Sequence, residues 1–170
     1  MCIRDRQWVE LGRASLSGNS GTIEVYQDAD GNQIDATDYD HIMILAHIIP
    51  SSSTHITWTT GSKTAWLNSG SNYNDRRMEN GTSSATSSRG ENGIISDNTS
   101  SGATLVWGHL TNIDGLPKTC IWRAMTNGGD GANNPDNMID TIGSCGQTDK
   151  MHRWKLNCQS SSSQTKFGSG

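Results

Sequence analysis

Apolar residues occur along this chain in short bursts that are separated by runs of Gly, Ser, Asn and Asp. Such bursts with polar punctuation predict β-strands joined by turns. We therefore predict strands over residues 8–16, 22–26, 42–49, 56–59, 105–110, 119–125, 138–142 and 153–158. No apolar period of 3.6 residues persists for three turns, so little helix is expected.

The predicted strands differ in how their apolar side chains divide between two faces. In residues 153–158, Trp154, Leu156 and Cys158 alternate with polar residues, and a period of two places them on one face. Residues 42–49 are apolar at almost every position, which is typical of a strand covered on both faces. Short strands joined by polar loops favour an all-β fold, an antiparallel β-sandwich with jelly-roll or Greek-key wiring.

The chain has 170 residues, which suits a single domain with one core. Its formal net charge is -4, with 13 Lys plus Arg and no run of them, so nucleic acid and anionic lipid are not expected partners. The longest apolar run, residues 42–49, is far shorter than the ~20 residues that cross a bilayer, so no membrane anchor is expected.

Two regions need separate treatment. Residues 1–6 read Met-Cys-Ile-Arg-Asp-Arg, which a sequencing-library adapter encodes when it is read through in this frame. We exclude them and assign residues 7–170 to one domain that we expect to be truncated at its C-terminus. Residues 61–101 are polar and have few apolar anchors; they form either a functional surface loop or a strand pair that the pattern does not reveal.

Several short motifs follow one another along the chain. Residues 43–51 read Met-Ile-Leu-Ala-His-Ile-Ile-Pro-Ser, residues 68–77 read Asn-Ser-Gly-Ser-Asn-Tyr-Asn-Asp-Arg-Arg, and residues 79–81 read Glu-Asn-Gly before a Thr/Ser tract. A Gly-rich segment at residues 128–135 and a closing Phe167 to Ser169 follow. In this order the chain resembles a family of uncharacterised virion-associated proteins from marine phage and environmental viral sequences.

The resemblance implies a jelly-roll sandwich without enzyme activity in a virus particle. The chain departs from the family at residues 68–69, where Asn-Ser replaces the usual Asn-Asp or Gly-Asp, which weakens any metal site there. Within this stretch, Asn72, Tyr73, Arg76 and Arg77 are candidate interaction residues. An Arg pair after a Tyr is suited to bidentate binding of a partner carboxylate at a subunit interface, and a solvated turn is the plain alternative.

One motif suggests catalysis. Residues 143–146, Gly-Ser-Cys-Gly, resemble the nucleophile loop of chymotrypsin-like viral cysteine proteases, with Cys145 as the thiol and His47 or His41 upstream as the base. The chain lacks the substrate-binding strand and histidine that follow the nucleophile in those proteases. We therefore favour a buried, incidental Cys145.

The six tryptophans raise a third possibility, since exposed rings stack on sugars. Trp58, Trp66, Trp107 and Trp122 are candidates for a carbohydrate platform. Apolar surroundings place Trp8, Trp107, Trp122 and Trp154 in the core, and we expect Trp66 to be the exposed ring.

Metal and disulfide chemistry have weak signals. Residues 28–32, Asp-Ala-Asp-Gly-Asn, begin like a calcium loop, but Gly31 stands in the fourth position instead of the sixth. We expect a solvated acidic turn and no metal or other cofactor, with calcium as the minor alternative. Free buried thiols are the plain interpretation of the cysteines, and a bridge from Cys120 or Cys145 to Cys158 is the alternative.

The sequence therefore predicts a non-enzymatic structural protein located in the virion, as capsid decoration or as a tail or fibre component. The expected partner is a second copy of the chain or a larger shell protein, with a glycan as a further candidate. The alternatives are a lectin-like carbohydrate-binding module and, third, the cysteine protease.

Overall fold

The computed structural model describes residues 8–15, 21–50, 54–67, 72–79, 86–90, 93–99, 103–127, 135–159 and 167–169. These residues form strands, turns and extended segments, and none of them is helical. Accordingly, no helix in the described ranges has the length and apolar character to cross a membrane. The strands are β1 (Thr22–Val25), β2 (His41–Pro50), β3 (Thr54–Gly61), β4 (Tyr73–Glu79), β5 (Thr86–Gly90), β6 (Gly93–Thr99), β7 (Thr104–Thr111), β8 (Lys118–Asn127), β9 (Pro135–Cys145), β10 (Arg153–Gln159) and β11 (Phe167–Ser169).

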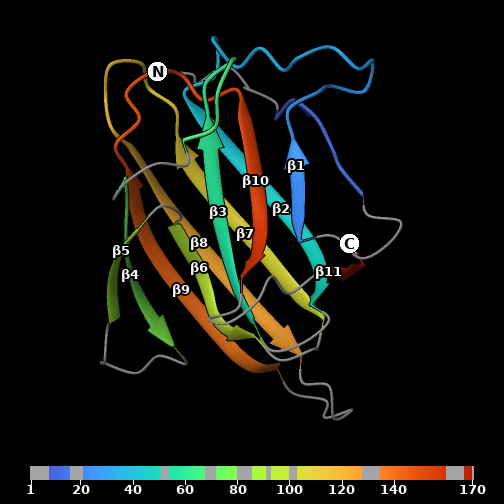
Figure 1. Cartoon of the computed structure of the whole chain (residues 1–170), viewed down its shortest axis with the longest axis vertical. Helices are drawn as coiled ribbons and strands as arrows, with labels where there is room; N and C mark the ends of the chain where they lie inside the picture. The colour runs from blue at the N-terminus through green and yellow to red at the C-terminus, as the bar shows by residue number, and fades with distance from the viewer. Residues whose placement is uncertain are drawn as a thin grey trace, which may run out of the picture.

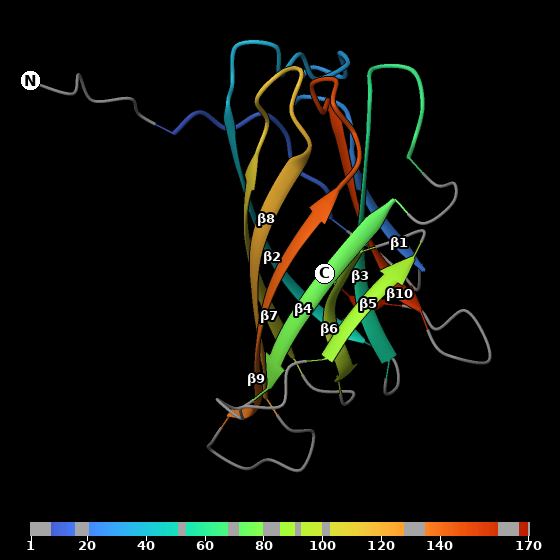
Figure 2. The ribbon, with the colours of Figure 1, turned by 90° about the vertical axis from the view of Figure 1, so that its left-hand side faces the viewer.

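Two antiparallel sheets pack together as a β-sandwich, which confirms the predicted fold class. The smaller sheet has the strand order β1-β10-β3-β6, and the larger has the order β11-β2-β7-β8-β9-β4-β5. Figure 1 shows β1, β10 and β3 crossing in front of the larger sheet. Figure 2 shows the two layers from the side, with β4 and β5 in front.

The strand order follows jelly-roll wiring with an added hairpin. In an eight-stranded jelly roll, the first, eighth, third and sixth strands form one sheet, and the second, seventh, fourth and fifth form the other. With β10 counted as the eighth strand, the smaller sheet has this order, and β2, β7, β4 and β5 keep it in the larger sheet. The hairpin of β8 and β9 is inserted between β7 and β4, and β11 extends the edge beyond β2. Because the hairpin adds two antiparallel strands, the chain reaches β10 in the direction that the jelly roll requires.

The core lies between the sheets and is centred on aromatic side chains. Trp58 of β3 contacts Trp122 of β8 at 5.6 Å between ring centroids and Tyr73 of β4 at 5.0 Å. Gly108 of β7 and Gly93 of β6 make room for these rings, since a Cβ atom at either glycine would overlap the indole of Trp122 or Trp58. The absence of a side chain at these two positions therefore lets large rings from both sheets share one core.

The predicted strands after residue 21 are confirmed in position, and the first is wrong. Residues 8–15 are extended but belong to neither sheet. Residues 61–101 were predicted to be either a surface loop or a hidden strand pair. They contain strands, because β4, β5 and β6 lie there. Sequence reasoning missed them because β4, with the sequence Tyr-Asn-Asp-Arg-Arg-Met-Glu, carries charged residues on both of its faces.

Several burial predictions are wrong. Trp8 is 64% exposed and Trp107 is 38% exposed, whereas Trp122 and Trp154 are buried as predicted. Strand β2 is covered on one face only: Ile42 and Ile48 are buried, while Met43 and Leu45 are exposed. Apolar residues on both sides of the strand predicted two covered faces, but among the described residues only the smaller sheet covers β2, on its inner face.

Candidate functional site

The predicted protease residues do not come together. Cys145 ends β9 on the inner face of the larger sheet and is 1% exposed. Burial raises the pKa of its thiol, which opposes formation of the thiolate that a nucleophile needs. His41 and His47 lie on β2, with β7 and β8 between them and β9, and their side chains are exposed on the outer face. The sheet itself therefore separates the thiol from both candidate bases.

The other described cysteines are also buried and free. Cys120 lies beside Gly143 on the neighbouring strand, and burial raises the pKa of its thiol to about 12. Cys158 is on the other sheet and is also a free thiol. These three residues match the plain interpretation of buried thiols, and the proposed bridges to Cys158 are not formed.

The four tryptophans predicted to line a sugar platform lie in three different places. Trp58 and Trp122 are inside the core, Trp107 is on the outer face of the larger sheet, and Trp66 follows β3. Trp66 is half-buried and not exposed as predicted. The guanidinium of Arg153 lies 5.3 Å and the ammonium of Lys155 4.7 Å from its ring centroid. These cations occupy ring surface that sugar stacking would require.

Alternation along β4 separates the predicted interaction residues. Tyr73 is buried, and its hydroxyl accepts from the Thr60 backbone N–H and donates to the Leu67 carbonyl; burial raises the pKa of this phenol. Arg77 points inward beside Asp75 at 3.4 Å, whereas Arg76 is exposed.

Asn72 precedes β4, and its carbonyl accepts from the Gly146 backbone N–H. Of these four residues only Arg76 is exposed on the outer face, so they do not form a shared binding patch.

The acidic residues near the predicted calcium turn serve different partners. Asp28 accepts from the backbone N–H groups of Asp30 and Asn32 and so closes the predicted turn. Asp35 binds Lys63, and this contact is the main reason that the pKa of the carboxyl lies well below its usual value. Within the described ranges, no group of three acidic, His or Cys side chains is placed to hold a metal ion.

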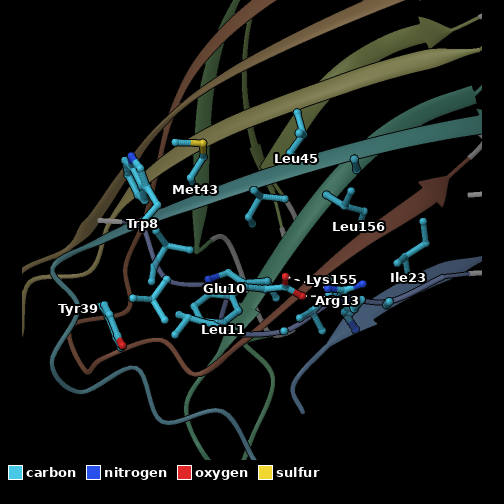
Figure 3. A pocket seen from close by; sticks show the side chains of 18 of the residues that line it. Trp8, Glu10, Leu11, Arg13, Ile23, Tyr39, Met43, Leu45, Lys155 and Leu156 are labelled. Carbon is cyan, nitrogen blue, oxygen red and sulfur yellow. Dashed lines mark hydrogen bonds and ion pairs between the residues drawn. The ribbon is translucent and has the colours of Figure 1, made fainter. Parts of the chain in front are cut away.

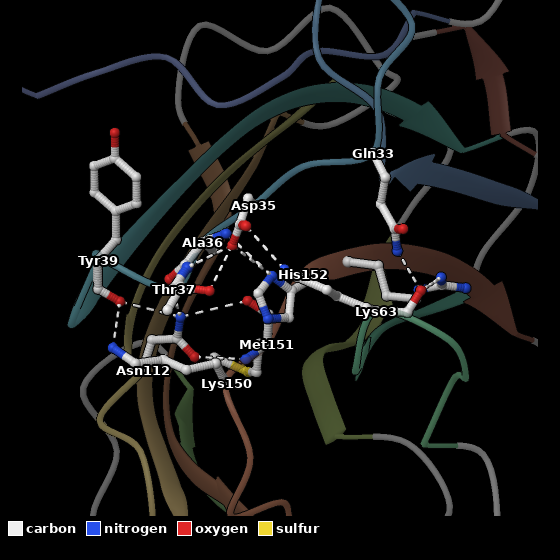
Figure 4. Close-up of polar contacts among 11 residues, drawn as sticks. Gln33, Asp35, Ala36, Thr37, Tyr39, Lys63, Asn112, Lys150, Met151 and His152 are labelled. Carbon is white, nitrogen blue, oxygen red and sulfur yellow. Dashed lines mark hydrogen bonds and ion pairs between the residues drawn. The ribbon is translucent and has the colours of Figure 1, made fainter.

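A buried polar cluster that sequence reasoning did not predict closes one end of the sandwich (Figure 4). The side-chain amide of Asn112 donates to the carbonyls of Tyr39, Ala36 and Met151, and its oxygen accepts from the Met151 N–H at 2.7 Å. Nδ1 of His152 accepts from the Ala36 N–H at 3.0 Å. Burial lowers the pKa of His152, and Lys63 contributes, so the imidazole is held in its neutral form. This cluster joins the loop before β2 to the segments before β8 and β10.

Lys118, the first residue of β8, completes this end of the molecule. Its side chain is fully buried, and its ammonium donates to the carbonyls of Ile113, Leu116 and Thr148. Burial is also the main cause of a lowered pKa for this lysine. A lysine is normally assigned to the surface, which is why sequence reasoning did not single out this one.

The most unusual surface is the outer face of the larger sheet. Alternate residues of five adjacent strands point outward there, and about half of them are large and apolar. We call this set the outer apolar face; it consists of Met43, Leu45, Leu105, Trp107, Ile121, Met138, Ile142 and Met78. Leu45 is 69% exposed and Ile142 is 62% exposed.

Strand register arranges the outer apolar face in rows. Leu45 pairs with Trp107, Trp107 with Arg123, and Arg123 with Asp140. Arg123 and Asp140 form a bidentate ion pair at 2.6 and 3.0 Å in the middle of the face. A row of polar residues closes the face at the loop end: His41, Thr111, Thr119, Ser144 and Asn74. The apolar residues thus surround one ion pair and end at a polar border, and the same face also carries Arg76, His109 and His47.

A groove adjoins this face along the part of β2 that β11 does not pair (Figure 3). It is a cavity of about 480 Å³ between β2, the edge of the smaller sheet and the extended segment 8–15. Its walls include Ile23, Ile44 and Leu156, and Glu10 pairs with Arg13 at 2.6 Å on the extended segment. Met43 and Leu45 line both the groove and the outer apolar face, so exposed apolar surface continues around the edge of the sheet.

Comparisons with protein-family models, with curated proteins and with solved structures found no match to this chain.

Proposed function

We propose that this chain is a non-enzymatic structural protein of a virus particle that acts through contacts between subunits. The observation that carries the proposal is the outer apolar face. Large exposed apolar areas on a folded domain mark surfaces that another molecule covers. In this chain the face spans five strands, from Met43 and Leu45 of β2 to Met78 of β4.

The wiring of the sheets is compatible with this role. Jelly-roll sandwiches serve both as viral capsid domains and as lectins, so the fold is compatible with the role but does not select it. The chain's resemblance to virion-associated proteins favours the capsid, tail or fibre setting over a free lectin. The two cations over the ring of Trp66 argue against the lectin alternative. The burial of Cys145 argues against the protease alternative.

The role in a particle can be tested by quantitative peptide mass spectrometry on purified particles of the virus that encodes the chain. Peptides from the chain should persist through density-gradient purification at a ratio to the major shell protein that is constant between preparations. A non-structural protein of the infected cell, expressed at a similar level, is the matched control and should be lost. Recovery of the chain in the cell lysate alone would refute the proposal.

A further inference from the structure

We propose that two copies of this chain pair through their outer apolar faces, with a two-fold axis that runs between β8 and β9 and parallel to them. This inference rests on the proposed function, because it names the partner of the same surface. We identify the partner as a second copy because this rotation places apolar residues of one face opposite apolar residues of the other, and the charged residues Arg123 and Asp140 opposite residues of opposite charge.

The complementarity follows from the register of the two central strands. An axis between β8 and β9 places each β8 opposite the β9 of the other copy. Ile121 pairs with Ile142 and Arg123 with Asp140 within one sheet, so the rotation brings each of these residues opposite its counterpart in the second copy. Apolar side chains then meet apolar ones, and each guanidinium meets a carboxylate.

Strands β7 and β4, which flank β8 and β9, are also compatible with this two-fold axis. Strand β7 comes to lie opposite β4 of the other copy, which sets the exposed Trp107 against the exposed Met78. The polar border meets itself, with Thr119 opposite Ser144. Arg76 meets His109, which is the least favourable contact of the set.

The available area suits a weak, reversible dimer. The rotation overlaps four strands of the face, β7, β8, β9 and β4, whereas β2 comes to lie opposite β5. Four strands spaced about 4.8 Å apart, with three outward residues each, give a flat area of roughly 400 Å² per copy. Two copies would bury roughly 800 Å² between these strands, which is below the standard size of a specific interface and in the range of weak, transient ones. The expected product is therefore a dimer in exchange with monomer, in which two larger sheets stack about 10 Å apart.

Sedimentation velocity of the full chain over a range of concentrations tests the pairing. Wild type should show a monomer–dimer equilibrium, and Ile142→Glu should weaken dimerisation about tenfold or more, since it places a carboxylate in the apolar centre. Leu116→Glu is the matched control: Leu116 is a similarly exposed apolar residue outside the face, and its substitution should leave the equilibrium unchanged. Circular dichroism melts check that each variant is folded.

Charge reversal tests the axis itself. Arg123→Asp places two carboxylates at the central pair of the face, and Asp140→Arg places two guanidinium groups there. Each variant alone should dimerise at least tenfold more weakly than wild type, and an equimolar mixture should regain dimers because opposite charges then face each other. Charge variants that each dimerise like wild type, or a mixture that stays monomeric, would overturn this arrangement.

The two proposals fail in different ways. A chain that stays monomeric up to its solubility limit but is recovered from purified particles would overturn the second-copy inference and leave the structural role intact. A dimer that is absent from particles would do the reverse.

Discussion

Asn112 provides the most direct test of how the sandwich is closed at its polar end. Its side chain is fully buried and bonds to both the N–H and the carbonyl of Met151, as well as to the carbonyls of Ala36 and Tyr39. The substitution Asn112→Ala removes all four contacts. The loop before β2 would then lose its main link to the segment before β10.

The cost can be worked out from the partners that remain. The Tyr39 carbonyl still accepts from Lys150, and the Ala36 carbonyl still accepts from the Tyr39 N–H. The Met151 N–H loses the short bond and is left buried, which costs about 1–3 kcal/mol. The space vacated by the amide adds to this loss, so we expect the free energy of unfolding to fall by about 2–4 kcal/mol.

Urea denaturation followed by tryptophan fluorescence measures this change. Asn74→Ala, at an exposed asparagine on β4, is the control and should change the free energy of unfolding by less than about 0.5 kcal/mol. The variant Asn112→Asp keeps the acceptor for Met151 but turns a carboxylate oxygen toward three carbonyls. It should therefore be least stable above about pH 4, where a free carboxyl ionises, and regain stability below it. A loss below about 1 kcal/mol for Asn112→Ala would refute the view that this amide holds the loops together.

Three further substitutions test other parts of the structure. Lys118→Met leaves three carbonyls without their ammonium donor and should lower the free energy of unfolding by about 2–4 kcal/mol, as measured by chemical denaturation. An unchanged denaturation midpoint would contradict the buried position of the lysine. Because burial lowers the pKa of His152 below its ordinary 6.5, the folded state binds fewer protons than the unfolded one, so stability should be full above about pH 6.5 and decline as the pH falls below it. His152→Asn, which retains an acceptor at the Nδ1 position, should remove that part of the pH dependence, as followed by thermal melts between about pH 5 and 8. Gly108→Ala should cost about 1–3 kcal/mol, because its methyl group overlaps the ring of Trp122, while Gly146→Ala, whose Cβ would have no atom closer than 3.9 Å, should be nearly neutral.

The sequence predicted well which residues share one face of a strand, and it predicted less well whether that face is buried. A period of two correctly grouped Trp154, Leu156 and Cys158 on one buried face. The same reasoning could not find the strand at residues 73–79, because its inward residues include Asp75 and Arg77, whose charges are paired inside the protein. Nor could it find the polar end of the sandwich, since a buried lysine or asparagine is recognised only from the carbonyls that surround it. Those carbonyls come from segments that lie far apart in the sequence.

Strand β2 shows how this limit bears on function. Its sequence predicts a strand covered on both sides, but β2 lies next to the short edge strand β11, and its outer side chains Met43 and Leu45 are exposed. A strand with one solvated face normally alternates apolar with polar residues, so selection for solubility alone would have placed polar residues at these outward positions. The exposed apolar side chains on five neighbouring strands depart from this rule in the same way and form one surface. The apolar pattern is therefore the one expected of an assembled form, in which a second molecule covers the face that the single chain leaves open.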